Sequence, residues 1–98
     1  MMHSLENARA IIDRTDREMA RLFQERMLAV KEIARYKAEN GLPVFDPERE
    51  AQVIEKNATL IEDKELSAYY VSFLQSVMDI SKKYQSTILE ECGSLSVE

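Results

Sequence analysis

The long N-terminal segment limits what the rest of the chain can fold into. Between Ser4 and Asn40 apolar residues recur at steps of three and four, which is the spacing of one face of a helix. The positions of this apolar stripe are Leu5, Ala8, Ile12, Met19, Leu22, Ala29, Ile33 and Tyr36. Ser4 is a suitable N-cap, and Asn40-Gly41 is a strong stop signal. The pattern therefore predicts a single helix over residues 4–40.

A helix of this length does not fit inside a compact chain of 98 residues. About 37 residues at ~1.5 Å each form a rod of roughly 55 Å, whereas a compact chain of this size has a diameter of about 33 Å. The helix must extend beyond its own domain, and its apolar stripe continues along the extension. A second copy related by a twofold axis is the simplest cover. A long coiled coil is the alternative, but Thr15 and Arg26 interrupt strict a and d apolar character.

A short second helix is expected after a connector. Pro43 keeps Leu42 out of helical backbone angles, so residues 41–45 are expected to link two helices. Asp46-Pro47 then supplies an N-cap and a first helical residue, and the helix is expected to end near residues 62–64. The inner face of this helix is Glu50, Val53, Ile54, Asn57, Leu60 and Ile61.

A third helix is expected from near Ser67, a good N-cap, to about Glu91, with Gly93 as its stop and residues 92–98 as a loose tail. Its inner face is Tyr70, Val71, Leu74, Val77, Met78, Ser81, Gln85, Ile88 and Leu89. Only 2 glycines and 2 prolines are available for turns, which argues against an all-β fold. We expect an all-α fold with one long, one short and one medium helix, in a single domain over residues 1–98.

Composition excludes several classes of function. A net charge of −5 argues against a nucleic-acid binder, which needs a basic surface. One cysteine, Cys92, and one histidine, His3, are too few for an intramolecular disulfide, a zinc site or a Ser-His or Cys-His catalytic pair. There is no apolar run of about 18 residues and no N-terminal signal. We therefore expect a cytoplasmic protein with a reduced Cys92, no metal and no membrane contact.

Five polar side chains interrupt the apolar faces of the predicted helices. They are Arg26, Lys37, Glu50, Ser81 and Gln85. A buried charge without a partner costs several kcal/mol, so these groups must meet one another or a ligand. A buried polar network that fixes helix register would explain one or two of them. Their occurrence on three helices favours a polar pocket between helices instead.

The charges of this pocket suggest its ligand. Arg26 and Lys37 lie eleven residues apart on nearly the same face, at roughly 16 Å, so their long side chains can converge. Arg9 lies roughly 25 Å from Arg26 along the same rod and could enter only the pocket of a partner chain. Three positive charges against the one negative charge of Glu50 suit a small dianion. Arginine binds carboxylates through two parallel hydrogen bonds, which favours a dicarboxylate.

The spacing of these residues resembles that of the all-helical chorismate mutase family, from about Leu5 to Leu89. The positions that carry the resemblance are Arg9, Asp13, Asp16, Leu22-Phe23, Arg26-Met27, Val30, Ile33-Ala34, Lys37, Pro43-Val44, Asp46-Pro47 and Arg49-Glu50. Ser81 and Gln85 fit the Ser and Gln pair of that family. The resemblance implies an intertwined six-helix homodimer in which each site takes one arginine from the neighbouring chain.

The resemblance also implies a role for each site residue. Arg26 and the partner subunit's Arg9 would hold the two carboxylates of chorismate. Lys37 and Gln85 would contact the ether oxygen, with Lys37 also touching a carboxylate. Glu50 and the Asp46 backbone would hold the ring hydroxyl. Arg49 and Ser81 would line the site near the ring carboxylate. The family converts chorismate to prephenate on the way to phenylalanine and tyrosine.

This reaction suits a chain that is poor in histidine and cysteine. The rearrangement is unimolecular and pericyclic, so it needs no nucleophile, general base, metal or cofactor. Catalysis comes from holding the enolpyruvyl arm over the ring and from stabilising charge that grows on the ether oxygen. An isochorismate pyruvate lyase on the same fold is one alternative. A non-catalytic helical dimerisation or regulatory module is the other.

Overall fold

The computed structural model describes the backbone of residues 4–97 and the side chains of residues 4–92. Within that range the chain forms three helices and no strand: α1 (Ser4–Asn40), α2 (Pro47–Ala58) and α3 (Lys64–Val97). The prediction of an all-helical chain with three helices is confirmed, and α1 begins and ends at the predicted residues. His3 and Glu98 lie outside the described residues. No helix in the described part of the chain has a segment long and apolar enough to cross a membrane.

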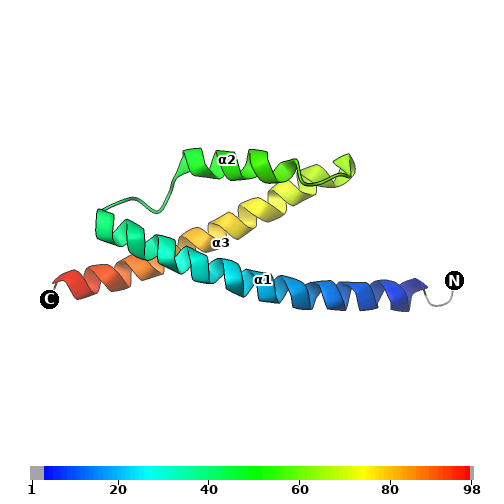
Figure 1. Cartoon of the computed structure of the whole chain (residues 1–98), viewed down its shortest axis with the longest axis horizontal. Helices are drawn as coiled ribbons and strands as arrows, with labels where there is room; N and C mark the ends of the chain where they lie inside the picture. The colour runs from blue at the N-terminus through cyan, green and yellow to red at the C-terminus, as the bar shows by residue number, and fades with distance from the viewer. Residues whose placement is uncertain (1–3, 98) are drawn as a thin grey trace.

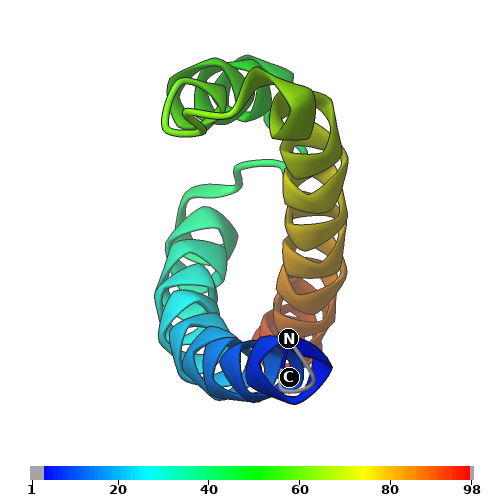
Figure 2. The ribbon, with the colours of Figure 1, turned by 90° about the vertical axis from the view of Figure 1, so that its right-hand side faces the viewer.

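The three helices form an elongated frame. Figure 1 shows α1 crossing α3, with α2 lying beside the N-terminal half of α3. In the side view of Figure 2, α3 connects α1, below, to α2, above. The chain measures 65 × 25 × 14 Å with a radius of gyration of 17.7 Å. A compact chain of this length has a radius of gyration near 13 Å, so the extended shape expected from the length of α1 is confirmed.

The interior of the chain is small. The buried residues lie on the second half of α1 and along α3: Val30, Ala34, Leu74, Met78 and Ile88, with the polar Ser81 and Gln85 among them. Every residue from 4 to 25 is exposed, and Leu5 and Ile12 of the apolar stripe are 60% and 56% exposed. The N-terminal half of α1 therefore carries an apolar surface that no other described part of the chain covers.

The face of α1 that packs on α3 differs from the predicted stripe. Ile33 and Tyr36 are exposed, whereas Val30 and Ala34 are buried against α3. Ala34 is 0% exposed, because its small side chain lets the two helices approach closely at their crossing. Helical periodicity identified the wider apolar face of α1 but could not show which of two faces meets α3. The predicted inner face of α3, in contrast, is buried or half-buried at every position.

The boundaries of the other helices also correct the prediction. α2 ends at Ala58, because hydrogen bonds from Leu60 N to Asn57 O (3.0 Å) and from Ile61 N to Ala58 O (3.3 Å) tighten its last turn. Leu60 and Ile61 therefore lie beyond the helix. α3 begins at Lys64 and not near Ser67, since Asp63 serves as the N-cap and accepts a hydrogen bond from Glu65 N at 2.9 Å.

The end of α3 was also predicted too early. A helical Gly93 costs about 1 kcal/mol relative to alanine but does not break a helix. The helix continues through Gly93 to Val97, so residues 92–97, expected as a loose tail, extend α3.

The connector between α1 and α2 is fixed at both ends. Gly41 has a φ of 63° and Leu42 N donates to Lys37 O at 2.9 Å, which together form a Schellman cap on α1. At the other end the Asp46 carboxylate accepts a hydrogen bond from Arg49 N at 3.1 Å and caps α2. The two caps set where the chain leaves α1 and where it enters α2.

We expect Gly41→Ala to lower the free energy of unfolding by about 1 kcal/mol, because alanine is strained at positive φ. No atom lies within 4 Å of the added methyl group, so strain and not a clash would cause the loss. Gly41→Asn is the matched control, since asparagine tolerates this conformation better and should lose less. Urea unfolding at one chain concentration measures both variants, and equal stability of Gly41→Ala and the native chain would contradict the cap.

Candidate active site

Arg26 and Ser81 join α1 to α3 at the crossing of the two helices. The Arg26 guanidinium donates a hydrogen bond from one terminal nitrogen to Ser81 Oγ, and Ser81 Oγ donates to Val77 O at 2.9 Å. Ser81 is 5% exposed, so the contact lies in the buried part of the chain. The serine is neutral, so the Arg26 guanidinium keeps its full positive charge, and its other N–H groups stay available to a ligand.

Lys37 and Gln85 form a second contact between the same helices. Lys37 Nζ donates to Gln85 Oε1 and to the Val44 carbonyl, each at 2.8 Å. Gln85 is 8% exposed, and the bond through its carbonyl oxygen turns its amide nitrogen away from Lys37. Among the described residues this nitrogen has no hydrogen-bond partner, so it is a neutral donor for a ligand. Val44 ties the α1–α2 connector to the same ammonium group.

Glu50 lies on α2 and is held by α3. Lys82 Nζ lies 3.0 Å from Glu50 Oε2 and 3.3 Å from Asp79 Oδ1. Gln75 Nε2 donates to Asp79 Oδ1 at 3.0 Å and approaches Glu50 Oε1 at 3.5 Å. The hydrogen bond to Glu50 is the main cause of a raised pKa for the Lys82 ammonium; burial opposes it and Asp79 adds to it. The pKa of Asp79 is lowered, mainly by the hydrogen bond from Gln75.

Charge is distributed unevenly over these contacts. In the part of the chain that the structure describes, neither Arg26 nor Lys37 forms an ion pair with a carboxylate. Glu50, the one acidic group among the predicted site residues that points to α3, is neutralised by Lys82. Two cations held by neutral partners form a place that attracts anions. No three His, Cys, Asp or Glu side chains of the described residues gather into a metal-binding group.

The remaining predicted site residues do not reach this cluster within one chain. Arg49 is exposed on α2, and Asp46 acts here as the cap of that helix. Arg9 is exposed on the overhanging half of α1. The structure thus brings together Arg26, Lys37, Ser81 and Gln85, while Glu50 of α2 contacts α3 at Lys82, the residue after Ser81.

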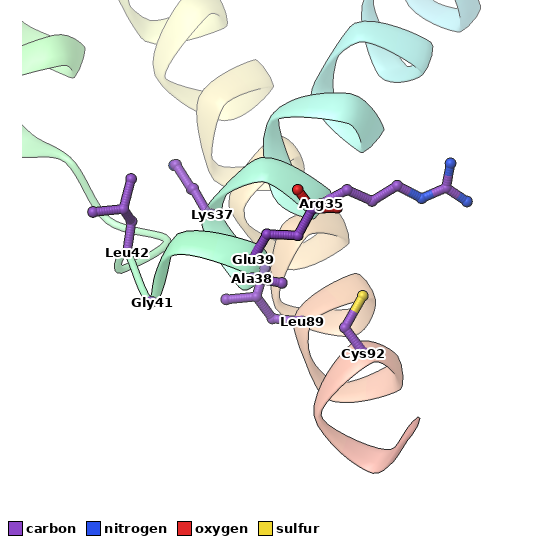
Figure 3. A pocket seen from close by; sticks show the side chains of 8 residues that line it. All are labelled: Arg35, Lys37, Ala38, Glu39, Gly41, Leu42, Leu89 and Cys92. Carbon is purple, nitrogen blue, oxygen red and sulfur yellow. The ribbon is translucent and has the colours of Figure 1, made fainter. Parts of the chain in front are cut away.

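An open pocket adjoins the cluster at the C-terminal end of α1. It has a volume of about 540 Å³ and is lined by Arg35, Lys37, Ala38, Glu39, Gly41, Leu42, Leu89 and Cys92. Figure 3 shows Leu89 and Cys92 of α3 beside Ala38 and Glu39 of α1. Lys37 is the one residue shared with the cluster, so the pocket marks an edge of the site and does not enclose it.

Sequence reasoning missed the residues that position Glu50. Lys82, Gln75 and Asp79 all belong to α3, and Lys82 follows Ser81 directly. The signal that could have found them is their spacing: Gln75, Asp79 and Lys82 are three or four residues apart and so share one helix face. That face lies beside the apolar one and turns toward α2.

The chain belongs to the chorismate mutase type II family, whose model matches residues 8–86. That range includes each predicted site residue, and the resemblance inferred from the sequence is confirmed. The chorismate mutase of Methanocaldococcus jannaschii is 28% identical over 92 residues, which cover 93% of each chain. No solved structure matches the chain significantly.

Two longer relatives match part of the chain. The T-protein of Haemophilus influenzae is 34% identical over 67 residues, which are 68% of this chain and 18% of that protein. The bifunctional chorismate mutase/prephenate dehydratase of Aquifex aeolicus is 42% identical over 55 residues, 56% of this chain and 15% of that protein. The chain thus spans less than a fifth of either relative.

We expect a small dicarboxylate to raise the melting temperature of the native chain at low ionic strength. Two cations without protein counter-ions should attract such a ligand, and at ten times its Kd the ligand would add about 1.4 kcal/mol of stability, or several degrees. Lys37→Met should abolish the shift, whereas Lys56→Met on α2 should keep it. A monocarboxylate at matched ionic strength serves as the ligand control. An equal shift in both variants would contradict a specific cationic site.

Proposed function

We propose that this protein catalyses the rearrangement of chorismate to prephenate. The observation that carries the proposal is the pair of cations, Arg26 and Lys37, held by neutral side chains of α3 inside the range that matches the family. Chorismate carries two carboxylates, which suit two cations that no carboxylate of the described chain neutralises. A cytoplasmic role in phenylalanine and tyrosine biosynthesis is part of the same proposal.

The arrangement of Lys37 and Gln85 supports the chemistry of this step. As the C–O bond breaks, negative charge grows on the ether oxygen, and donors fixed in advance stabilise it most effectively. Lys37 is fixed by two acceptors, and the bond from Lys37 to Gln85 Oε1 leaves the Gln85 amide nitrogen as a second donor. Gln85 needs no protonation to donate, so this contact persists at neutral pH.

The remaining residues are proposed to bind and orient the substrate. Glu50 and the Asp46 backbone hold the ring hydroxyl, and Arg49 and Ser81 line the site near the ring carboxylate. Arg26 grips one carboxylate. Together these contacts hold the flexible enolpyruvyl arm over the ring, which removes much of the entropic barrier to reaction.

The active unit is proposed to be an intertwined six-helix homodimer. The apolar residues of the N-terminal half of α1 are exposed in a single chain, and burying them against a second copy would stabilise both. Arg9 lies in that half, and in an antiparallel pair it would enter the partner's site and complete the grip on the second carboxylate. A non-catalytic dimerisation module would bury the same surface but would not turn over chorismate.

We expect Lys37→Ala and Gln85→Ala each to lower kcat by about 10²–10³, because each removes a donor to the ether oxygen. Both variants should keep the helical circular dichroism of the native chain. Lys56→Ala, at an exposed position of α2, is the control and should keep normal turnover. Near-normal kcat in both site variants would contradict the proposed roles.

The same assay separates the proposed reaction from its alternatives if the products are identified. Prephenate from chorismate supports the proposal. Pyruvate and salicylate from isochorismate would instead identify an isochorismate pyruvate lyase. No turnover of either compound, together with greater stability of variants at Arg26 and Lys37, would identify a non-catalytic module.

We expect a mixture of inactive Arg9→Ala and inactive Arg26→Ala chains to recover activity after subunit exchange. Each mixed dimer would hold one site with an intact Arg26 from one chain and an intact Arg9 from the other. A mixture of Arg26→Ala and Lys37→Ala is the control, since both residues belong to one chain's part of the site and neither site would be intact. Absence of recovery in the first mixture would contradict the donation of Arg9 across the dimer.

A further inference from the structure

Lys82, which follows Ser81 of the cluster, is a cation that carboxylates of the chain already neutralise. Its ammonium contacts Glu50 Oε2 at 3.0 Å and Asp79 Oδ1 at 3.3 Å, and it lies 4.7 Å from the centroid of the Phe45 ring. Two of the three N–H donors of the ammonium group can therefore face carboxylate oxygens, and the Phe45 ring contacts the cation through its face. Lys82 is therefore already paired with carboxylates of the chain, unlike Arg26.

Glu50 is bound through both of its carboxylate oxygens. Lys82 holds Oε2, while the amide nitrogen of Gln75 lies 3.5 Å from Oε1. The Glu50 side chain is 17% exposed, so its position is also restricted by its surroundings. A carboxylate has about four acceptor positions, so a hydroxyl group of a ligand can still donate to it. Lys82 and Gln75 of α3 thus restrict the orientation of the Glu50 carboxylate on α2.

Phe45 links the same ammonium to the connector. Phe45 directly precedes Asp46, the residue whose backbone is proposed to share the ring hydroxyl with Glu50. The cation–π contact with Lys82 therefore places the connector and Glu50 against one point of α3. Because Lys82 contacts both Glu50 and the residue next to Asp46, it is placed to set the relative position of the two proposed hydroxyl partners.

We infer that Lys82 is a positioning residue that aligns Glu50 and the Phe45–Asp46 backbone for the ring hydroxyl of the substrate, without touching the substrate itself. The inference rests on the proposed function. It separates the cations of the site by role: Arg26 and Lys37, with neutral partners, bind the substrate, whereas Lys82, with carboxylate partners, orients another residue.

The test compares chorismate with an analogue in which hydrogen replaces the ring hydroxyl. We expect Lys82→Met to lower kcat/KM for chorismate on the order of tenfold more than for the analogue, the lower end of the loss seen for residues that orient ligand-contacting groups in metal sites. General effects on folding or on anion attraction would reduce both values and cancel in their ratio. Glu50→Gln should change the same ratio in the same direction.

Two further variants complete the test. Lys82→Arg keeps a charged donor and should restore most of the ratio, and Lys83→Met, at the exposed neighbouring position, should leave it unchanged. If Lys82→Met lowers kcat/KM equally for chorismate and for the analogue, or lowers neither, the inference is overturned. Either result would leave the proposed function intact. If the native chain does not convert chorismate, the proposed function fails and the inference falls with it.

Discussion

The hydrogen bonds that join α1 to α3 run from cations to neutral acceptors, and the site depends on this choice of partners. Arg26 donates to Ser81 and Lys37 to Gln85. A glutamate or aspartate at either position of α3 would hold the helices together as well, but it would cancel the charge that attracts an anion. The neutral partners position both cations and leave their charge for a ligand. Without a ligand the two cations repel each other, which is the usual conflict between stability and function at a binding site.

The length of α1 explains both the small interior and the proposed dimer. Its C-terminal half packs on α3 around Val30 and Ala34, and its N-terminal half extends into solvent with Leu5, Ile12 and Leu22 exposed. No side chain of the described residues is both large and fully buried. In the proposed dimer, a chain with so little interior of its own would gain much of its hydrophobic stabilisation from the partner. Folding and assembly of the proposed site would then be one event, because the half of α1 that the proposed dimer buries is also the half that carries Arg9.

The sequence predicted features that have a local cause. Ser4, Asn40-Gly41 and Asp46-Pro47 are cap signals, and the structure places the ends of α1 and the start of α2 at them. The prediction of the inner face of α3 was also correct, since α3 has a single apolar face and only that face can pack against the other helices. The predicted start of α3 was wrong because two N-cap candidates competed, and the carboxylate of Asp63 was favoured over the hydroxyl of Ser67. The predicted end of α2 was wrong because its last turn tightens after Asn57. Which face of α1 meets α3 depends on a crossing between distant segments, which periodicity within α1 does not determine.

The candidate site shows the same division between local and tertiary information. Polar residues within apolar faces identified Arg26, Lys37, Glu50, Ser81 and Gln85, because burial of a polar group requires a reason that can be read from one helix. Lys82 could not be found this way, since it lies beside the apolar face of α3 and resembles an ordinary surface lysine. Its significance comes from α2, which brings Glu50 to 3.0 Å from its ammonium. The identity of the partner, and not the charge of the residue itself, therefore separates the cations proposed to bind a ligand from the one proposed to orient a neighbour.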